Sequence, residues 1–253
     1  MISLFFSILL FLILLIFEIE RNKYPEVPFF DFYTPGNLFQ KFILSLNNAF
    51  ILIFDKRSIY PISEYNELKP FIEDYKHIQQ EVMDSVSKYS LTQANIFDSN
   101  FDYNPDYGYY FLKFSNHLIH ENLPIFPKLY QTLKKCSNIR TCFFSIIRGP
   151  KNIPTHRGPS KGLLRFHLPI YNDYPEKNYL QVKDKKLYWN TKPFLFDDTF
   201  YHKLVKNDNG MRISLICDVE RHLPRGLQQL NQLVQDSFTN SNFVKERLNK
   251  LIL

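Results

Sequence analysis

Short apolar runs with a two-residue period fill residues 141–219, and this pattern constrains the fold more than any other feature of the chain. Gly, Pro, Asn and Asp separate the runs, which is typical of strands joined by tight turns. The seven runs are TCFFSIIRG, LLRFHLPIY, NYLQVKD, KLYWN, PFLFDD, FYHKLVK and MRISLICDV. Seven strands at this spacing predict an antiparallel sandwich or barrel with hairpins, one of them turning near residues 183–186.

Helical patterns lie on both sides of this region. Apolar side chains at three- and four-residue spacing predict amphipathic helices, the first of them interrupted early by Pro70. The predicted helices cover residues 66–89, 124–136, 226–238 and 243–253. Residues 95–110 are rich in Asp, Asn, Tyr and Phe, and we predict a loop there.

The first 17 residues are apolar except for two serines, and charged residues follow at once. At ~1.5 Å per residue such a helix reaches about 25 Å, near the thickness of a bilayer core. Because a basic leader and a small-residue cleavage site are absent, a retained single-pass anchor is expected over a signal peptide, with a buried core helix as the alternative. Arg21 and Lys23 behind the segment favour a cytosolic body.

Charge is distributed unevenly along the chain. The whole sequence has 31 basic and 25 acidic side chains, a net charge of +6, and residues 141–253 have 18 and 10, a net of +8. We therefore expect anion binding in the second half. Nucleic acid is not an expected partner, because the basic residues are scattered and no recognition helix or stacking motif accompanies them. Three cysteines without a C-x-x-C pair indicate neither a disulfide framework nor a zinc site.

Two histidines are candidates for a metal site. His156 follows Pro154 and Thr155 in a predicted loop, and His202 lies in a predicted strand. Two imidazoles brought together by a sheet could hold iron(II), which is bound with open positions for further ligands. The alternative is that both are surface or hydrogen-bonded histidines.

Polar residues on the predicted strands add a second clue. Arg165 and His167 are two residues apart on one strand and therefore share a face, as do Arg212 and Ser214 on another. An arginine on an inward face needs an anionic partner, because an unpaired buried charge is very costly. A dicarboxylate would supply one and would suit a bidentate guanidinium. The alternative is that these faces are solvated.

These motifs together resemble the aspartyl/asparaginyl β-hydroxylase family of Fe(II)- and 2-oxoglutarate-dependent dioxygenases, which includes the bacterial lipid A acyl-chain hydroxylases. The resembling stretches are His156–Leu168, Phe196–His202, Met211–Arg212 and Cys217–Val219. The resemblance is continuous from about Ser145 to Pro224. The terminal apolar segment, the YTPGN sequence and the ELKP sequence resemble the lipid A hydroxylase branch.

The resemblance implies an α+β fold: a double-stranded β-helix (jelly roll, cupin-like) with flanking helices and an N-terminal transmembrane helix. It also implies catalytic and ligand-binding roles for six residues. His156 and His202 would bind iron, and 2-oxoglutarate would be held by Ser145, Arg165, His167 and Arg212, with Arg212 at its distal carboxylate.

One position departs from the pattern of many dioxygenases of this fold, which have H-x-D at the first metal motif. Here the third position is Gly158. Water would then fill the vacancy on iron, or Asp197 or Asp198 would enter it. The other reading of these two aspartates is that they form a turn and orient His202.

The predicted organisation has five parts: a transmembrane anchor at 1–19, an extended linker at 20–36, a helical lead-in at 37–140, a jelly-roll dioxygenase core at 141–224 and C-terminal helices at 225–253. We expect a membrane-anchored dioxygenase that uses Fe(II), 2-oxoglutarate and O2 to hydroxylate an unactivated carbon. Its expected partners are the membrane, through the N-terminal helix, and a substrate that is either a protein Asp or Asn side chain or a lipid acyl chain. A non-catalytic jelly-roll binding module is the alternative, and the oligomeric state stays open.

Overall fold

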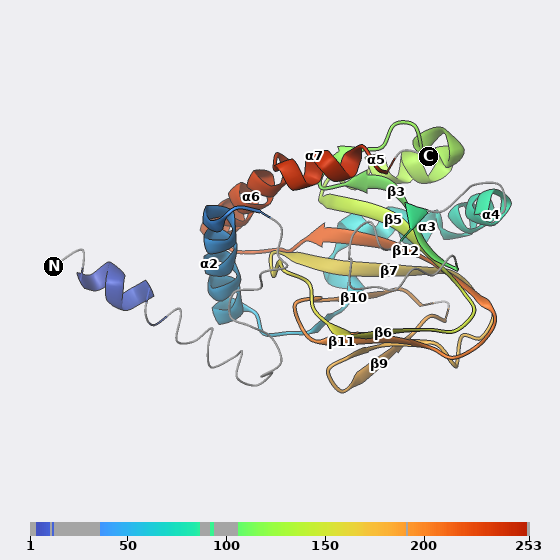
Figure 1. The fold of residues 1–253 in the computed structure, drawn as a ribbon, viewed down its shortest axis with the longest axis horizontal. Helices are drawn as coiled ribbons and strands as arrows, with labels where there is room; N and C mark the ends of the chain where they lie inside the picture. The colour runs from blue at the N-terminus through green and yellow to red at the C-terminus, as the bar shows by residue number, and fades with distance from the viewer. Residues whose placement is uncertain are drawn as a thin grey trace.

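Two antiparallel sheets and several helices make up the fold, which is of the mixed helix-and-sheet class (Figure 1). The computed structural model describes residues 4–10, 12, 36–86, 92–93, 106–190 and 192–251. The larger sheet has the order β1-β10-β7-β12-β5-β3-β2, with β4 paired to β3, and the smaller has the order β6-β11-β8-β9. The predicted antiparallel strands are thus confirmed, and they form two sheets.

The larger sheet is built from β1 (Ile59–Tyr60), β2 (Thr92–Gln93), β3 (Tyr107–Phe114), β4 (His117–Leu118), β5 (Ile139–Arg148), β7 (Leu163–Asn172), β10 (Phe194–Phe196) and β12 (Met211–Glu220). The smaller sheet is built from β6 (Lys151–His156), β8 (Tyr179–Val182), β9 (Lys185–Tyr188) and β11 (His202–Lys206). The helices are α2 (Leu38–Phe54), α3 (Lys69–Glu73), α4 (Tyr75–Val86), α5 (Pro127–Lys134), α6 (Arg225–Thr239) and α7 (Asn242–Leu248).

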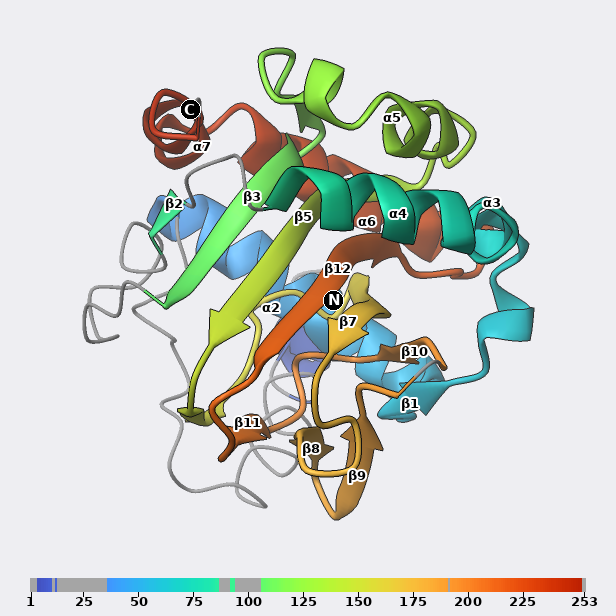
Figure 2. The same ribbon diagram turned by 90° about the vertical axis from the view of Figure 1, so that its right-hand side faces the viewer.

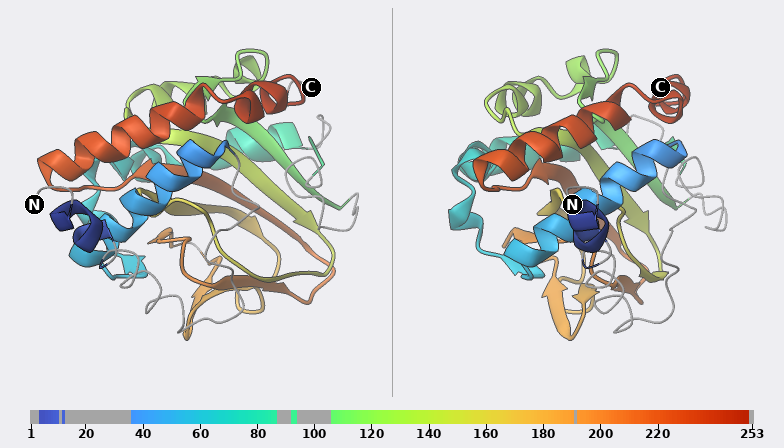
Figure 3. Two further views of the ribbon diagram at one scale, coloured as in Figure 1. Left: turned by 60° about the vertical axis from the view of Figure 1, so that its left-hand side comes forward. Right: turned by 90° about the vertical axis from the view of Figure 1, so that its left-hand side faces the viewer.

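The two faces of the larger sheet have different neighbours. Helices α3, α4 and α5 cover its outer face, where Phe71 and Ile78 pack in one core with Phe166 and Leu215 (Figure 2). Its inner face turns toward the smaller sheet and shares a second core with it, in which Trp189 is buried. Helices α2 and α6 lie side by side on the inner side of the larger sheet (Figure 3).

The position of helix α2 against the sheet follows from its cap and its buried side chains. Asn37 caps its first turn by accepting a hydrogen bond from the backbone N–H of Gln40, and the Gln40 side chain accepts from the N–H of Asn37, both at 2.9 Å. Leu44 and Ile51 are buried, and Asn47 between them donates to Asn231 of α6 at 2.8 Å. This buried polar contact fixes the two helices against each other.

The predicted transmembrane anchor at residues 1–19, and with it the single-pass localisation, is wrong. Within the described ranges, no helix is long and apolar enough to cross a bilayer. The helical residues described at this end are 4–10 and 12. The predicted linker at 20–36 lies almost wholly outside the described residues.

All seven predicted strands are present, and β8 and β9 are joined by the predicted tight turn, with Lys183 at a φ of +54°. Two longer strands were not predicted. Strand β6 contains Pro154 and lacks alternation, which an edge strand tolerates because it pairs on one side only. Strand β3 begins inside the predicted loop at 95–110, so the range 37–140 is helical only in part. The predicted helix at 66–89 is divided at Asp74 into α3 and α4, and Pro70 lies in the first turn of α3.

A fully buried lysine fixes the loops at one end of the sheets. The ammonium of Lys206 donates to the carbonyl oxygens of Gly149 (2.9 Å), Asp208 (3.0 Å) and Gly210 (2.7 Å), and it pairs with the Asp208 carboxylate at 2.7 Å. One side chain therefore connects the β5–β6 turn to the β11–β12 turn.

Replacement of this lysine is expected to cost more stability than replacement of its neighbour. Lys206→Met leaves the Asp208 carboxylate buried without its cation, so we expect a loss of ~3 kcal/mol or more in the free energy of unfolding. Lys203→Met, on the partly exposed side of the same strand, is the control and should change it by less than about 1 kcal/mol. Urea titration followed by circular dichroism measures both, and equal losses would contradict the assigned role.

Candidate active site

The two predicted metal-binding histidines are neighbours across two strands. His156 is the last residue of β6 and not part of a loop, and it faces His202, the first residue of β11, in the antiparallel register. Their ring centroids are 4.2 Å apart. Pairing of β6 with β11 therefore brings together two imidazoles that are 46 residues apart in the chain.

Backbone contacts define which ring nitrogen of each histidine can bind a metal. The Nδ1 of His156 lies 2.8 Å from the carbonyl oxygen of Pro154, and the Nδ1 of His202 lies 2.8 Å from that of Phe200. A carbonyl accepts only, so we assign the proton to Nδ1 and the lone pair to Nε2 in both rings. Burial, helped by His156, lowers the pKa of His202 well below its usual range, which keeps this ring neutral. Both residues thus suit a metal with two imidazole ligands.

Asp198 fills the space beside Gly158, the third position of the motif that begins with His156. A Cβ at position 158 would lie 2.2 Å from the Asp198 Oδ2, and the Gly158 N–H donates to the Asp198 carbonyl oxygen at 2.7 Å. Arg165 holds the same carboxylate at 3.1 Å. Burial raises the pKa of Asp198 to about 6, although the Arg165 guanidinium acts against this rise. Across the described residues no group of three or more His, Cys, Asp or Glu side chains could hold a metal ion.

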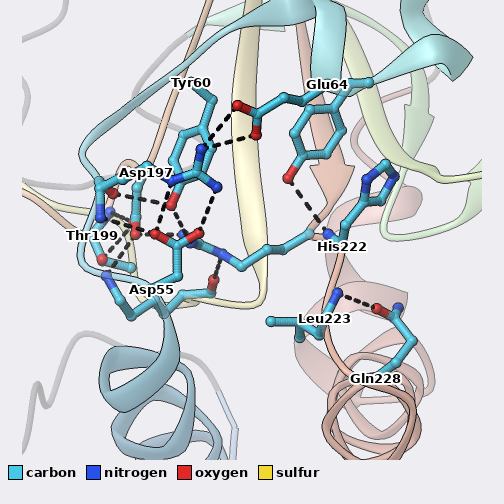
Figure 4. A network of polar contacts seen from close by, with 12 residues as sticks. Asp55, Tyr60, Glu64, Asp197, Thr199, His222, Leu223 and Gln228 are labelled. Carbon is cyan, nitrogen blue, oxygen red and sulfur yellow. Dashed lines mark hydrogen bonds and ion pairs between the residues drawn. The ribbon is translucent and has the colours of Figure 1, made fainter.

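Asp197 has a different environment and is fully buried. Its Oδ2 accepts from Lys161 at 2.6 Å and from Arg221 at 2.5 Å, and its Oδ1 accepts from the Thr199 hydroxyl at 2.6 Å. Figure 4 shows this network with Tyr60 beside it; the Tyr60 hydroxyl accepts a further hydrogen bond from Arg221. With its oxygens engaged in this way, Asp197 acts as a structural anchor and is not arranged as a metal ligand.

The segment that follows His156 is held from several sides. Asn48 of α2 donates to the carbonyl oxygen of Pro159 and accepts from the N–H of Lys161, both at 2.8 Å. Asn231 of α6 donates to the carbonyl oxygen of Gly162 at 3.1 Å, and a Cβ at that glycine would lie 1.7 Å from the Asn231 Oδ1. Helices α2 and α6 therefore position the loop between the first histidine and β7.

Arg212 is a buried cation with unused hydrogen-bond donors. Its side chain is fully buried on β12, its Nη2 donates to the Ser145 hydroxyl at 2.7 Å, and its guanidinium lies 4.5 Å from the Trp189 ring. Its Nε and Nη1 have no hydrogen-bond partner, and among the described residues no carboxylate pairs with it. Burial lowers the pKa of Arg212 to about 10, so it remains charged at neutral pH. Such a group is arranged to receive an external anion.

His167 lies close to this arginine and is also buried. The indole N–H of Trp189 donates to the His167 Nδ1 at 3.3 Å. Burial, together with the charges of Arg212 and Arg165, lowers the pKa of His167 well below its usual range. A neutral imidazole that accepts at Nδ1 has its proton on Nε2, so His167 offers one N–H donor.

Three of the four residues expected to hold 2-oxoglutarate therefore lie around one point: Ser145, His167 and Arg212. Arg165 shares their strand face but already pairs with Asp198 and with Asp218, at 3.1 and 3.0 Å. These two carboxylates raise the pKa of Arg165 despite desolvation. Arg165 therefore has carboxylate partners within the protein, whereas Arg212 has none among the described residues.

Sequence analysis did not identify Trp189 as a residue of the site. It contacts both Arg212 and His167, and its only signal in the sequence is that it is the single tryptophan. Lys161 and Asp218 were missed as well, because their roles depend on partners in other strands and loops.

Comparison with known proteins assigns the class. The sequence pattern of the Aspartyl/Asparaginyl beta-hydroxylase family matches residues 72–222. An ornithine lipid ester-linked acyl 2-hydroxylase of Rhizobium tropici is 28% identical over 130 residues, which span 51% of this chain and 46% of that protein. The chain thus aligns with about half the length of this curated relative.

Solved structures of hydroxylases are also similar in part. A prolyl hydroxylase of Trichoplax adhaerens aligns with a TM-score of 0.42 at 12% identity, covering 78% of this chain and 98% of that one. A prolyl-4-hydroxylase of Pseudomonas putida aligns with a TM-score of 0.38 at 11% identity, covering 60% and 88%. Scores in this range are too low to support an argument about function.

The chain belongs to the Aspartyl/Asparaginyl beta-hydroxylase family, whose pattern covers more than half of the chain. The predicted family is confirmed.

The contact between Gly158 and Asp198 leads to a test by a double-mutant cycle. Gly158→Ala should lower the free energy of unfolding by ~1–3 kcal/mol, because the added methyl group overlaps the Asp198 carboxylate. In an Asp198→Ala background the same substitution should cost about 0.5 kcal/mol or less, since the obstacle is gone. Gly226→Ala is the control, because a Cβ there meets nothing within 4 Å. Equal costs of Gly158→Ala in both backgrounds, measured by urea unfolding, would show that the two residues do not compete for space.

Proposed function

We propose that this protein is a hydroxylase, an Fe(II)- and 2-oxoglutarate-dependent dioxygenase with a double-stranded β-helix core. It would hydroxylate an unactivated carbon of a protein Asp or Asn side chain or of a lipid acyl chain. The observation that carries the proposal is the buried, unpaired guanidinium of Arg212 on the same sheet face as a neutral His167. Folding places a cation there that no described carboxylate neutralises, and a dicarboxylate cosubstrate would do so.

Each residue of the site has a defined task in this proposal. Arg212 and the Ser145 hydroxyl would bind one carboxylate of 2-oxoglutarate, and the His167 Nε2–H would donate to the cosubstrate nearby. His156 and His202 would hold the iron through Nε2. When bound, iron and 2-oxoglutarate supply an oxidative decarboxylation that yields succinate and CO2 and delivers one oxygen atom of O2 to the substrate carbon.

The surrounding residues orient this arrangement. Asp198 pairs with Arg165 and lies beside Gly158, so it would not serve as a third protein ligand of the metal. Arg212, His167 and His202 are buried, which would limit the access of water to the groups that they bind and would favour transfer to the substrate over side reactions. Two substrate classes are supported by different comparisons: the family description favours Asp and Asn, and the name of the Rhizobium relative favours an acyl chain.

Succinate formation tests the iron and cosubstrate assignment. The full chain, purified without oxygen and supplied with Fe(II), should convert 2-oxoglutarate slowly to succinate even without its substrate. His156→Ala and His202→Ala should each abolish this turnover, because a single imidazole cannot hold the metal. His77→Ala, an exposed histidine of α4, should leave it unchanged. If the wild type neither binds iron nor forms succinate, the proposal is wrong.

Arg212 has a separate test, because it would act on the cosubstrate and not on the metal. Arg212→Met should raise the 2-oxoglutarate concentration needed for half-maximal turnover by about 10- to 100-fold, as expected for loss of a charged hydrogen bond of ~1.5–3 kcal/mol. Iron binding, followed through the visible absorbance of a Co(II) substitute, should not change. Arg225→Met, at the exposed start of α6, is the control. Loss of metal binding in Arg212→Met with the cosubstrate requirement unchanged would contradict the assignment.

A further inference from the structure

A cavity of about 160 Å³ lies where α2, α6 and α7 cover one end of the larger sheet. Its walls are mostly apolar: Leu44 of α2, Phe238 of α6, Val244 of α7, Phe114 of β3 and Leu163 of β7 contribute to them. At ~30 Å³ for a group the size of a water molecule, the cavity has room for roughly five such groups. A methylene group is of similar size.

The polar side chains in its walls already have partners within the protein. Arg140 is paired with Glu220 at 2.5 Å and with Asp236 at 2.6 Å, and the Gln235 amide donates to the Ser160 hydroxyl at 2.7 Å. A polar ligand would give up its hydrogen bonds to water here and gain few in return. An apolar ligand has no such cost and gains the burial of its surface.

The cavity continues the inner face that holds the candidate active site. Leu163 is two residues before Arg165 on β7, so both side chains point to the same face, about 7 Å apart along the strand. Phe111, Phe143 and Ile216 form an apolar cluster on the neighbouring strands, with the two phenyl rings stacked at 4.7 Å. The cavity and the histidine pair are also joined by the chain itself, because the wall residue Pro159 follows His156 by three positions.

We infer that this cavity binds part of an acyl chain of the substrate, so that the chain extends from the metal site along β7 to the space beneath α6 and α7. The inference rests on the proposed function and selects the lipid class of substrate over the peptide class. A peptide would bring backbone N–H and C=O groups that need partners, whereas the polar wall groups described above are already paired. A hydrocarbon chain matches the apolar lining of the space.

Fluorescence of cis-parinaric acid, a polyene fatty acid that emits when it leaves water, tests the inference on the full chain. Wild-type protein should bind it, and dodecanoate should displace it. Val244→Phe fills the cavity from α7 and should weaken binding at least about tenfold, equivalent to ~1.4 kcal/mol. Leu233→Phe is the matched control, because that side chain is exposed on the opposite side of α6 and should leave binding unchanged. Unchanged binding in folded Val244→Phe would overturn the inference, as would displacement by an Asp- and Asn-containing peptide but not by dodecanoate.

A second measurement needs no variant and covers the case in which Val244→Phe does not fold. Dodecanoate added to the wild type should slow amide hydrogen exchange in α6 and α7, and the absence of such protection would overturn the inference. Succinate formation in the same preparation reports on the proposed function independently. Turnover without chain binding would remove only the cavity assignment, and chain binding with no iron uptake or turnover would remove only the dioxygenase assignment.

Discussion

The buried carboxylate of Asp197 is the contact on which the geometry of the candidate site depends. It is the partner of two buried cations, Lys161 and Arg221, whose charges would be very costly in this interior without it. Lys161 comes from the loop after His156, Asp197 from the segment before His202, and Arg221 from the end of β12. One carboxylate therefore joins three chain segments, two of which carry the histidines. The close approach of the two imidazoles is thus tied to the charge balance of the core.

Two arginines on the inner face illustrate the difference between a structural charge and a binding charge. Arg165 is partly exposed and has two carboxylate partners, Asp198 and Asp218, which raise its pKa. Arg212 is fully buried, has a hydroxyl and an aromatic face as neighbours, and its pKa is lowered. A fold that retains such an unneutralised cation is destabilised by it, and an anion that binds there would restore stability as well as affinity.

Sequence reasoning identified the strands and the two histidines because both have local signals. In the seven strands successive side chains point to opposite faces of a sheet, and His156 and His202 are part of recognisable motifs. It failed where the outcome depends on non-local partners. The roles of Trp189 and Asp198 are defined by residues about 22 and 40 positions away, which only the register of the sheets brings near. Strand β6 has no apolar alternation, because it is an edge strand. The anchor prediction failed because no helix of the described residues has the length and apolar character that a bilayer requires.

Along β7 the inner face of the larger sheet changes from charged to apolar. This change limits which ligands can bind at each point of the strand. His167 lies beside the unpaired Arg212, Arg165 follows in a neutralised ion cluster, and Leu163 opens into an apolar cavity. These three residues are separated by single strand steps of ~6.6 Å, so the whole sequence of environments spans about 13 Å. The first environment suits a small anion, because the Arg212 guanidinium has no carboxylate partner among the described residues, and the third suits an apolar group. The proposed cosubstrate and the proposed acyl chain would therefore occupy opposite ends of this strand face.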